Sequence, residues 1–132
     1  MKYSILIALI ALSISVSAQR NVGTVFTVDT LDNTETLTFT LDARINDYGD
    51  MFYHVAADSL SGATAGTIYY EMSTDAAGTE WTTLATDAIN GVSIDESYAA
   101  TGFLGLRARI RCVGVGTMST EISPSISFKR RQ

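Results

Sequence analysis

The stretch Phe103 to Val113, FLGLRARIRCV, decides how this sequence is interpreted. Successive side chains of a β-strand point to opposite faces, and here two kinds of residue alternate. One face carries the apolar residues Leu104, Leu106, Ala108, Ile110 and Cys112, and the other carries Gly105, Arg107, Arg109 and Arg111. The alternation predicts a long half-buried strand whose outer face bears three guanidinium groups.

Alternation of the same kind recurs along the chain, and no segment has a convincing helical period. Turn signals such as Asn90–Gly91 separate the alternating segments. The pattern predicts eight strands, at residues 22–28, 34–45, 51–57, 67–73, 81–85, 92–98, 103–113 and 120–128. We therefore expect an all-β fold: a single antiparallel β-sandwich or jelly-roll-like domain of about eight strands.

Three local expectations go with this assignment. Leu31 to Asn33 should form a turn, and the small residues 59–66 (SLSGATAG) should form a loop. Pro124 has no N–H to donate to a β-ladder, so the last strand is expected to lie at a sheet edge, at least at that residue.

Residues 1–18 (MKYSILIALIALSISVSA) have the pattern of a secretory signal peptide. Lys2 is followed by an apolar, helix-like run from Ile5 to Val16, and small residues precede Gln19. We expect cleavage after Ala18; if the segment is kept, it would be a membrane anchor or a buried arm. Residues 19–132 then form the β-sandwich domain, and the expected location is a virion, the periplasm or the cell surface.

Charge is distributed unevenly along a chain whose net charge is −5. Residues 19–106 contain two basic and thirteen acidic residues, whereas residues 107–132 contain six basic residues and one acidic residue. The acidic balance argues against nucleic acid as a partner. The strand arginines either pair with acidic strands of the same domain or meet the acidic face of another subunit. The interface candidates are Arg107, Arg109, Arg111, Lys129, Arg130 and Arg131.

Side chains with catalytic or metal-binding chemistry are few. Cys112 is the only cysteine and should be a buried structural thiol. His54 is the only histidine, so a triad or a zinc site would have to be built around it alone. Three acidic pairs, Asp29 with Asp32, Asp47 with Asp50 and Asp95 with Glu96, are expected to be solvated turns, with calcium binding as the alternative. We expect no catalytic residues, no metal and no cofactor.

The segment STDAAGTEW, residues 73–81, resembles the Asp-box turn, in which an Asp side chain holds backbone amides and a Trp packs beneath them. The motif residues are Ser73, Asp75, Gly78 and Trp81. The usual spacing is S-x-D-x-G-x-x-W, and here Gly and Trp each fall one residue late. A structural turn is expected, with ligand contact as the alternative.

A wider resemblance covers about half the chain. The pieces DSLSGATAGTIYYEMSTDAAGTEW (residues 58–81) and FLGLRARIRCVGVGT (residues 103–117), with a serine-rich final strand, resemble small β-sandwich modules of bacteriophage virion proteins. The resemblance implies a capsid, decoration or fibre-associated role and includes no catalytic motif. The apolar N-terminal segment departs from the usual pattern.

Three hypotheses of function follow. The first is a non-enzymatic structural subunit of a virion or surface assembly, whose partners are copies of itself or other subunits, with membrane contact through residues 1–18 as an option. The second is an exported carbohydrate- or cell-surface-binding module that uses an exposed row of aromatic residues from Tyr48, Phe52, Tyr53, Tyr69, Tyr70 and Tyr98. The third, with the least support, is a small hydrolase.

Overall fold

The structure is a computed structural model, and it describes residues 21–41, 48–102 and 104–130. These residues form nine β-strands and no helix. The strands are β1 (Asn21–Val25), β2 (Asp29–Asp32), β3 (Thr36–Leu41), β4 (Tyr48–Gly62), β5 (Ala65–Ser73), β6 (Thr82–Asn90), β7 (Ser93–Thr101), β8 (Arg107–Gly114) and β9 (Met118–Arg130).

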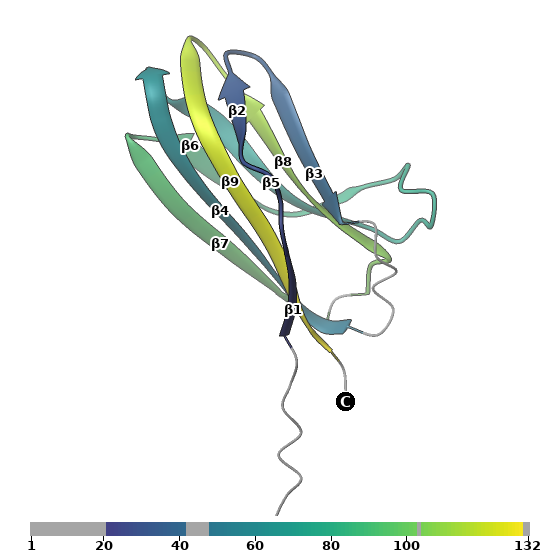
Figure 1. Ribbon diagram of the computed structural model, residues 1–132. Helices are drawn as coiled ribbons and strands as arrows, with labels where there is room; N and C mark the ends of the chain where they lie inside the picture. The colour runs from purple at the N-terminus through teal and green to yellow at the C-terminus, as the bar shows by residue number, and fades with distance from the viewer. Residues whose placement is uncertain (1–20, 42–47, 103, 131–132) are drawn as a thin grey trace, which may run out of the picture.

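The strands build two antiparallel sheets that pack face to face (Figure 1). The first sheet has the order β1-β9-β4-β7, and β2 also pairs with β9. The second sheet has the order β3-β8-β5-β6 and lies behind the first in Figure 1. The all-β sandwich predicted from the alternation is thereby confirmed. It contains nine strands because the chain forms two strands, β1 and β2, before Asn33, instead of one strand and a turn.

Both β1 and β2 pair with the same long strand, β9. Val25 lies opposite Ser125 and Asp29 lies opposite Ile122, so the chain leaves the ladder between these two positions. The predicted turn at Leu31 to Asn33 is displaced: Leu31 is a buried strand residue, and the chain turns at Asn33, whose φ is +38°. Leu31 stays in the strand because its side chain belongs to the apolar core.

The expectation that β9 is an edge strand is wrong for the strand as a whole and holds only at Pro124, where β1 has ended and β2 has not yet begun. This strand lies between β4 on one side and β1 with β2 on the other. The carbonyl oxygen of Pro124 accepts a hydrogen bond from Phe26 N at 3.1 Å, which places the backbone N of Pro124 toward the gap between β1 and β2. The missing N–H therefore costs no ladder bond, and proline is tolerated inside the sheet at this one position.

The predicted loop at residues 59–66 is also wrong, because β4 continues to Gly62 and β5 begins at Ala65. The small residues serve close packing instead. A Cβ on Gly62, whose φ is +77°, would lie 2.0 Å from the backbone oxygen of Thr117, and a Cβ on Gly66 would lie 2.5 Å from the backbone oxygen of Val113. Only glycine leaves room for these neighbouring strands.

The strand that was expected to span residues 103–113 begins only at Arg107. Its partner β5 ends at Ser73, which lies opposite Arg107. A hydrogen bond of 2.7 Å from Leu106 N to the Ser73 oxygen is the last contact between the two backbones, so the ladder does not extend to Leu104. Leu104, which the alternation assigns to the inner face, is instead 75% exposed in the connection from β7. From Ala108 to Cys112 the predicted inner face is buried as expected.

The core between the sheets is apolar and aromatic. Tyr53 of β4 and Tyr70 of β5 are fully buried, with ring centroids 5.6 Å apart, and Tyr98 stacks on Tyr70 at 5.5 Å. Cys112 is also fully buried, and burial raises the pKa of its thiol to about 12, so it is an unreactive packing residue at neutral pH.

Several expectations lie outside the described residues. They include the leader at residues 1–18, Asp47 and Arg131, and for Arg130 only the backbone position in β9 is given. In the part of the chain that the structure does describe, no helix is long and apolar enough to cross a membrane.

Candidate contact surface on the second sheet

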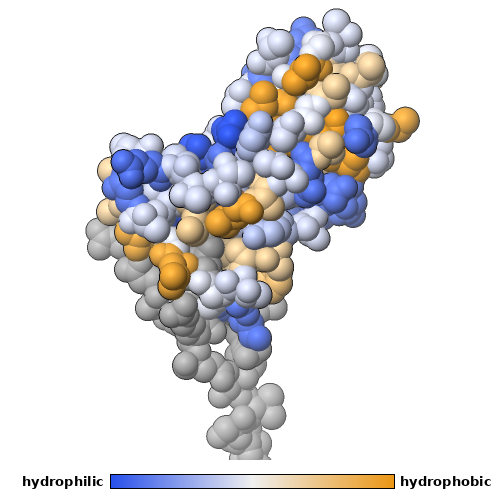
Figure 2. Space-filling model, turned by 180° about the vertical axis from the view of Figure 1, so that it is seen from behind, coloured by the Kyte–Doolittle hydropathy of each residue, from blue (hydrophilic) through white to orange (hydrophobic). Residues whose placement is uncertain are grey.

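The outer face of the second sheet collects the charged and aromatic residues that the sequence separates. Strand register aligns four outward-facing residues in one row across the sheet: Thr40 of β3, Arg109 of β8, Glu71 of β5 and Thr83 of β6. The next row contains Arg111 opposite Tyr69. We call the set Arg107, Arg109, Arg111, Tyr69, Glu71 and Trp81 the arginine face. Figure 2 views the molecule from this side and shows hydrophilic surface interrupted by separate hydrophobic patches.

Glu71 lies at the centre of the arginine face and binds two guanidinium groups. Arg109 Nε donates to Oε2 of Glu71, and Arg111 Nη2 donates to Oε1 at 2.8 Å. The hydroxyl of Thr83 adds a hydrogen bond to Oε1 at 3.3 Å. The Glu71 side chain is only 4% exposed, whereas those of Arg109 and Arg111 are 20% and 27% exposed. Two arginines therefore share one buried carboxylate.

The protonation of Glu71 follows from this pairing. Burial by itself raises the pKa of the carboxyl group, but hydrogen bonds from Arg111 and Arg109 outweigh burial, and the pKa is lowered. The same contact with Glu71 raises the pKa of Arg111. The three side chains are all charged at neutral pH, and the cluster keeps one excess positive charge.

Aromatic rings hold the two guanidinium groups in place. The guanidinium carbon of Arg109 lies 4.1 Å from the centroid of Trp81, and that of Arg111 lies 3.9 Å from the centroid of Tyr69. These are cation–π distances. Arg109 uses Nε for its hydrogen bond to Glu71. Its terminal amino groups donate to no other group in the described part of the chain. The arginine face thus presents fixed N–H donors to the outside.

The Asp-box-like turn closes one end of the arginine face. Asp75 accepts hydrogen bonds from Ala77 N at 2.9 Å and Thr79 N at 3.0 Å, and the Thr79 hydroxyl also donates to it. These bonds from Thr79 and Ala77 lower the pKa of Asp75 to about 2. Trp81 Nε1 donates to the carbonyl oxygen of Gly78 at 2.8 Å, which fixes the ring against the turn.

Gly78 joins the turn to the arginine row. Its φ is +69°, and a Cβ at this position would lie 2.8 Å from Nη1 of Arg107. Ser73, at the base of the turn, accepts a hydrogen bond from Asp75 N at 3.1 Å and lies opposite Arg107 in the ladder. Ser73 and Gly78 of the motif therefore adjoin Arg107, and Trp81 adjoins Arg109, although about thirty residues separate them in sequence.

The structure does not bring Lys129 to this surface. Lys129 is on β9 in the first sheet, opposite Asn21 and Asp50. The basic residues of the chain's last part are thus divided between the two sheets and form no single patch among the described residues. The sequence pattern pointed to Tyr69 only as a member of an aromatic row for sugar binding, and it pointed to no functional role for Glu71. The signal for both residues was their position on the outward side of a strand.

Two of the acidic pairs predicted as turns are instead strand residues, because Asp29 and Asp32 begin and end β2 and Asp95 and Glu96 lie within β7. His54, Asp29 and Asp50 have local partners. His54 Nε2 lies 2.6 Å from Asp95 Oδ1 on the outer face of the first sheet. Asp29 accepts from Thr30 N, and Asp50 accepts from Gly102 N. Among the described residues, no three His, Cys, Asp or Glu side chains are grouped to hold a metal ion.

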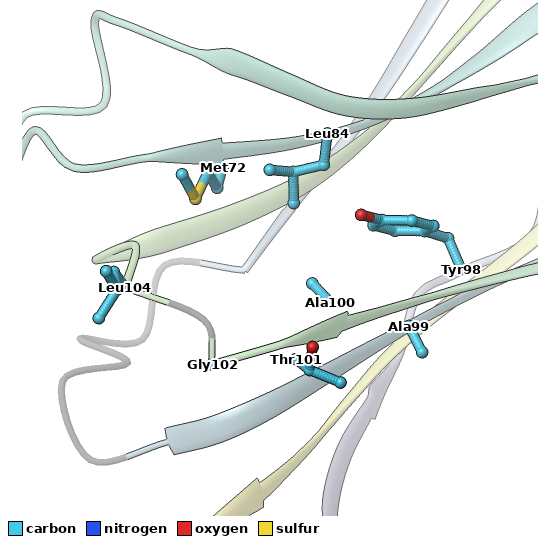
Figure 3. A pocket seen from close by; sticks show the side chains of 8 residues that line it. All are labelled: Met72, Leu84, Tyr98, Ala99, Ala100, Thr101, Gly102 and Leu104. Atoms are coloured by element: carbon cyan, nitrogen blue, oxygen red, sulfur yellow. The ribbon is translucent and has the colours of Figure 1, made fainter.

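A cavity of about 240 Å³ opens between the sheets beside the end of β7 (Figure 3). Met72 and Leu84 line it from the second sheet, Ala100 and Thr101 line it from β7, and Leu104 stands at its rim. Its lining is mainly apolar, with Tyr98 and Thr101 as the residues that carry hydroxyl groups, and it includes no carboxylate, imidazole or amine. The cavity therefore offers space for an apolar group.

The sequence matches no protein-family model and no curated protein, but solved structures share its fold. The PBSX exported protein XepA matches with a TM-score of 0.63 and 18% identity over 84% of this chain and 38% of that chain. PirA matches with 0.53 and 11% identity over 86% and 99% of the two chains. The Yersinia pseudotuberculosis-derived mitogen matches with 0.50 and 11% over 86% and 88%. This chain spans less than two fifths of the XepA chain, and at these identities the similarity shows the fold alone.

Proposed function

We propose that this chain is a non-enzymatic, exported β-sandwich module that acts through surface contacts, as a structural subunit of a bacteriophage virion or another surface assembly. One observation carries the proposal: Glu71, Trp81 and Tyr69 hold the guanidinium groups of Arg109 and Arg111 in fixed positions at a sheet surface. A surface whose donors are already ordered loses little side-chain entropy when a partner binds.

The pattern of residues 1–18 and the fold similarity to the PBSX exported protein XepA both support export. The resemblance of residues 58–81 and 103–117 to virion modules supports an assembly role. Capsid, decoration and fibre-associated positions are all compatible with such a module.

The absence of catalysis is part of the proposal and is supported by where the reactive side chains lie. Cys112 is buried with a raised pKa, and His54 pairs with Asp95 on a flat sheet surface. The cavity beside the end of β7 is lined by no carboxylate, imidazole or amine. General acid–base chemistry needs such a group within reach of a bound substrate.

A carbohydrate-binding role has less support. Sugar stacking needs an exposed aromatic ring face, but Arg109 lies over Trp81 and Arg111 lies over Tyr69. Tyr53 and Tyr70 are buried in the core, and Phe52, at 44% exposure, lies on the other sheet.

Fractionation of the source culture tests the proposal directly. The expected result is that the chain co-purifies with a particle or a surface structure, and that cross-linking followed by mass spectrometry places its neighbours against one sheet surface. Recovery only as a free monomer in the supernatant, with no cross-linked neighbour, would contradict it. Binding on a glycan array in that case would favour the carbohydrate-binding alternative.

A further inference from the structure

The outer face of the first sheet carries an unusual arrangement of carboxylates. Strand register places Asp58 of β4 directly opposite Glu121 of β9, and both side chains are exposed. Both strands are internal to the sheet, so this is a like-charge pair in a regular ladder, which is destabilising by itself. Neither residue has an ion-pair partner in the described part of the chain.

Two further carboxylates extend this pair across the sheet. Asp32 of β2 lies opposite Ser119, one outward position from Glu121 along β9. Asp95 of β7 lies opposite Ala56, one outward position from Asp58 along β4. Asp32, Glu121, Asp58 and Asp95 therefore form a diagonal line over four neighbouring strands, which we call the acidic band. The adjoining outward positions are occupied mainly by the small residues Ser123, Ser125, Ala56, Ser97 and Ala99. His54 lies between Ser125 and Ser97 with its Nε2 2.6 Å from Asp95 Oδ1, so among the described residues Asp95 is the one carboxylate of the band with an ion-pair partner.

The opposite outer face of the same molecule has the complementary charge. Arg109 and Arg111 on the outer face of the second sheet share the single carboxylate of Glu71, which leaves this cluster with one excess positive charge. The flanking strands present uncharged threonines, Thr38 and Thr40 on β3 and Thr83 and Thr86 on β6. Because the two faces lie on opposite sides of the sandwich (Figure 1), one copy cannot satisfy its own acidic band with its own arginine face.

We infer that the acidic band of one copy docks on the arginine face of the next, so that copies of this chain stack head to tail. The inference rests on the proposed function and names its partner: a second copy of this chain. Such a contact joins two different surfaces and leaves one of each free, so it generates open stacks and not closed dimers.

The contact is expected to be weak and sensitive to salt. Four strands about 4.8 Å apart, each contributing about six residues at about 3.4 Å, make a face of about 400 Å² per copy. The roughly 800 Å² buried by two such faces is below the usual size of a stable interface. Charge pairing between exposed groups is screened within about 10 Å at 0.1 M salt and about 3 Å at 1 M. Stacking would then need high local concentration, as in an assembly.

Sedimentation velocity of the purified chain over a concentration series tests the inference. At about 20 mM salt the mean sedimentation coefficient should rise with concentration and continue past the dimer, and at about 0.5 M salt it should return to the monomer value. The double variant Asp58→Lys with Glu121→Lys should weaken association at least about tenfold. Its thermal unfolding should stay close to that of the wild type, because one exposed like-charge pair replaces another at the same two positions.

A matched control separates docking from net charge. Glu80→Lys is an exposed charge reversal in the hairpin beside the arginine face, away from the acidic band. If the acidic band docks on the arginine face, Glu80→Lys should leave association unchanged or strengthen it. If only net charge matters, Glu80→Lys should change association as much as Asp58→Lys alone or Glu121→Lys alone does.

Mixing tests the head-to-tail geometry. The double variant keeps its arginine face, so a small amount of it should cap wild-type stacks and lower their mean size. Failure to cap, or equal association of the double variant and the wild type, would overturn the inference while leaving the assembly function standing. A wild-type chain that is monomeric at low salt but recovered from a particle would do the same. Absence from every particle, by contrast, would overturn the proposed function.

Discussion

The two outer faces of this sandwich differ in whether their charged side chains are paired with groups of opposite charge. On the second sheet, a buried Glu71 lies between Arg109 and Arg111, and the register makes the pairing complete within one domain. On the first sheet, the same kind of register sets Asp58 against Glu121, with no cation between them. Cross-strand neighbours thus stabilise the outer face of the second sheet and destabilise that of the first sheet by like-charge repulsion. The first sheet is therefore the one that an external cationic partner would stabilise.

The largest expected effect comes from removing the shared carboxylate. Glu71→Ala leaves two partly buried guanidinium groups without their counter-charge and should lower the free energy of unfolding by about 2–4 kcal/mol, less than for a fully buried pair because both arginines reach solvent. Chemical denaturation measures this. The same substitution on the other face, Glu121→Ala, should cost less than about 0.5 kcal/mol. Equal losses at the two sites would remove the contrast between the faces.

The next effect concerns the turn that supports the arginine face. Gly78→Ala places a Cβ at φ +69° and 2.8 Å from Arg107 Nη1, so backbone strain of about 1–2 kcal/mol adds to the displacement of that side chain. Gly116→Ala is the matched control, because its φ is +82° and no atom lies within 4 Å of the added Cβ. Thermal or denaturant unfolding should show a larger loss for Gly78→Ala, and an equal loss would mean that Arg107 moves aside freely.

Lowering the pH should remove the contribution that ionised Asp75 makes to the stability of the same turn. Its pKa is about 2 in the folded chain and 3.8 without the turn, so its contribution to stability is complete above pH 3.8 and is lost as the pH falls toward 2. The melting temperature of the wild type should therefore decline more steeply between pH 4 and 2 than that of Asp75→Asn. Parallel curves would show that the Thr79 and Ala77 hydrogen bonds do not favour the ionised form.

The smallest effect should be a gain in stability on the first sheet. Asp58→Asn removes the repulsion from Glu121 and should raise the free energy of unfolding by about 0.2–1 kcal/mol at low salt. The gain should shrink at about 0.5 M salt, where exposed charges are screened. Urea unfolding of the monomer at low protein concentration measures it, and a loss of stability would show that the pair is already balanced within the domain.

Much of the fold followed from side-chain alternation. The inward face of residues 108–112 and the burial of Cys112 agree with the expectation. The turn expected at Asn90–Gly91 is shifted by one residue, because Asn90 ends β6 and the chain turns at Gly91, with φ +89°, and Val92. Alternation is a local property of an extended backbone, so it can be observed without knowing which strands pair. The edge assignment of β9 failed for the opposite reason, because Pro124 is tolerated only through the gap between β1 and β2, which depends on two other strands.

The sequence by itself determined an all-β sandwich, an inward-facing thiol and an outward row of arginines, because each depends only on neighbours two residues apart. Only the tertiary structure decided which carboxylate those arginines meet and which carboxylates stay unmatched. Register between strands distant in sequence places Glu71 beside β8 and Glu121 beside Asp58, and a shift of one residue would turn every one of these side chains to the other face.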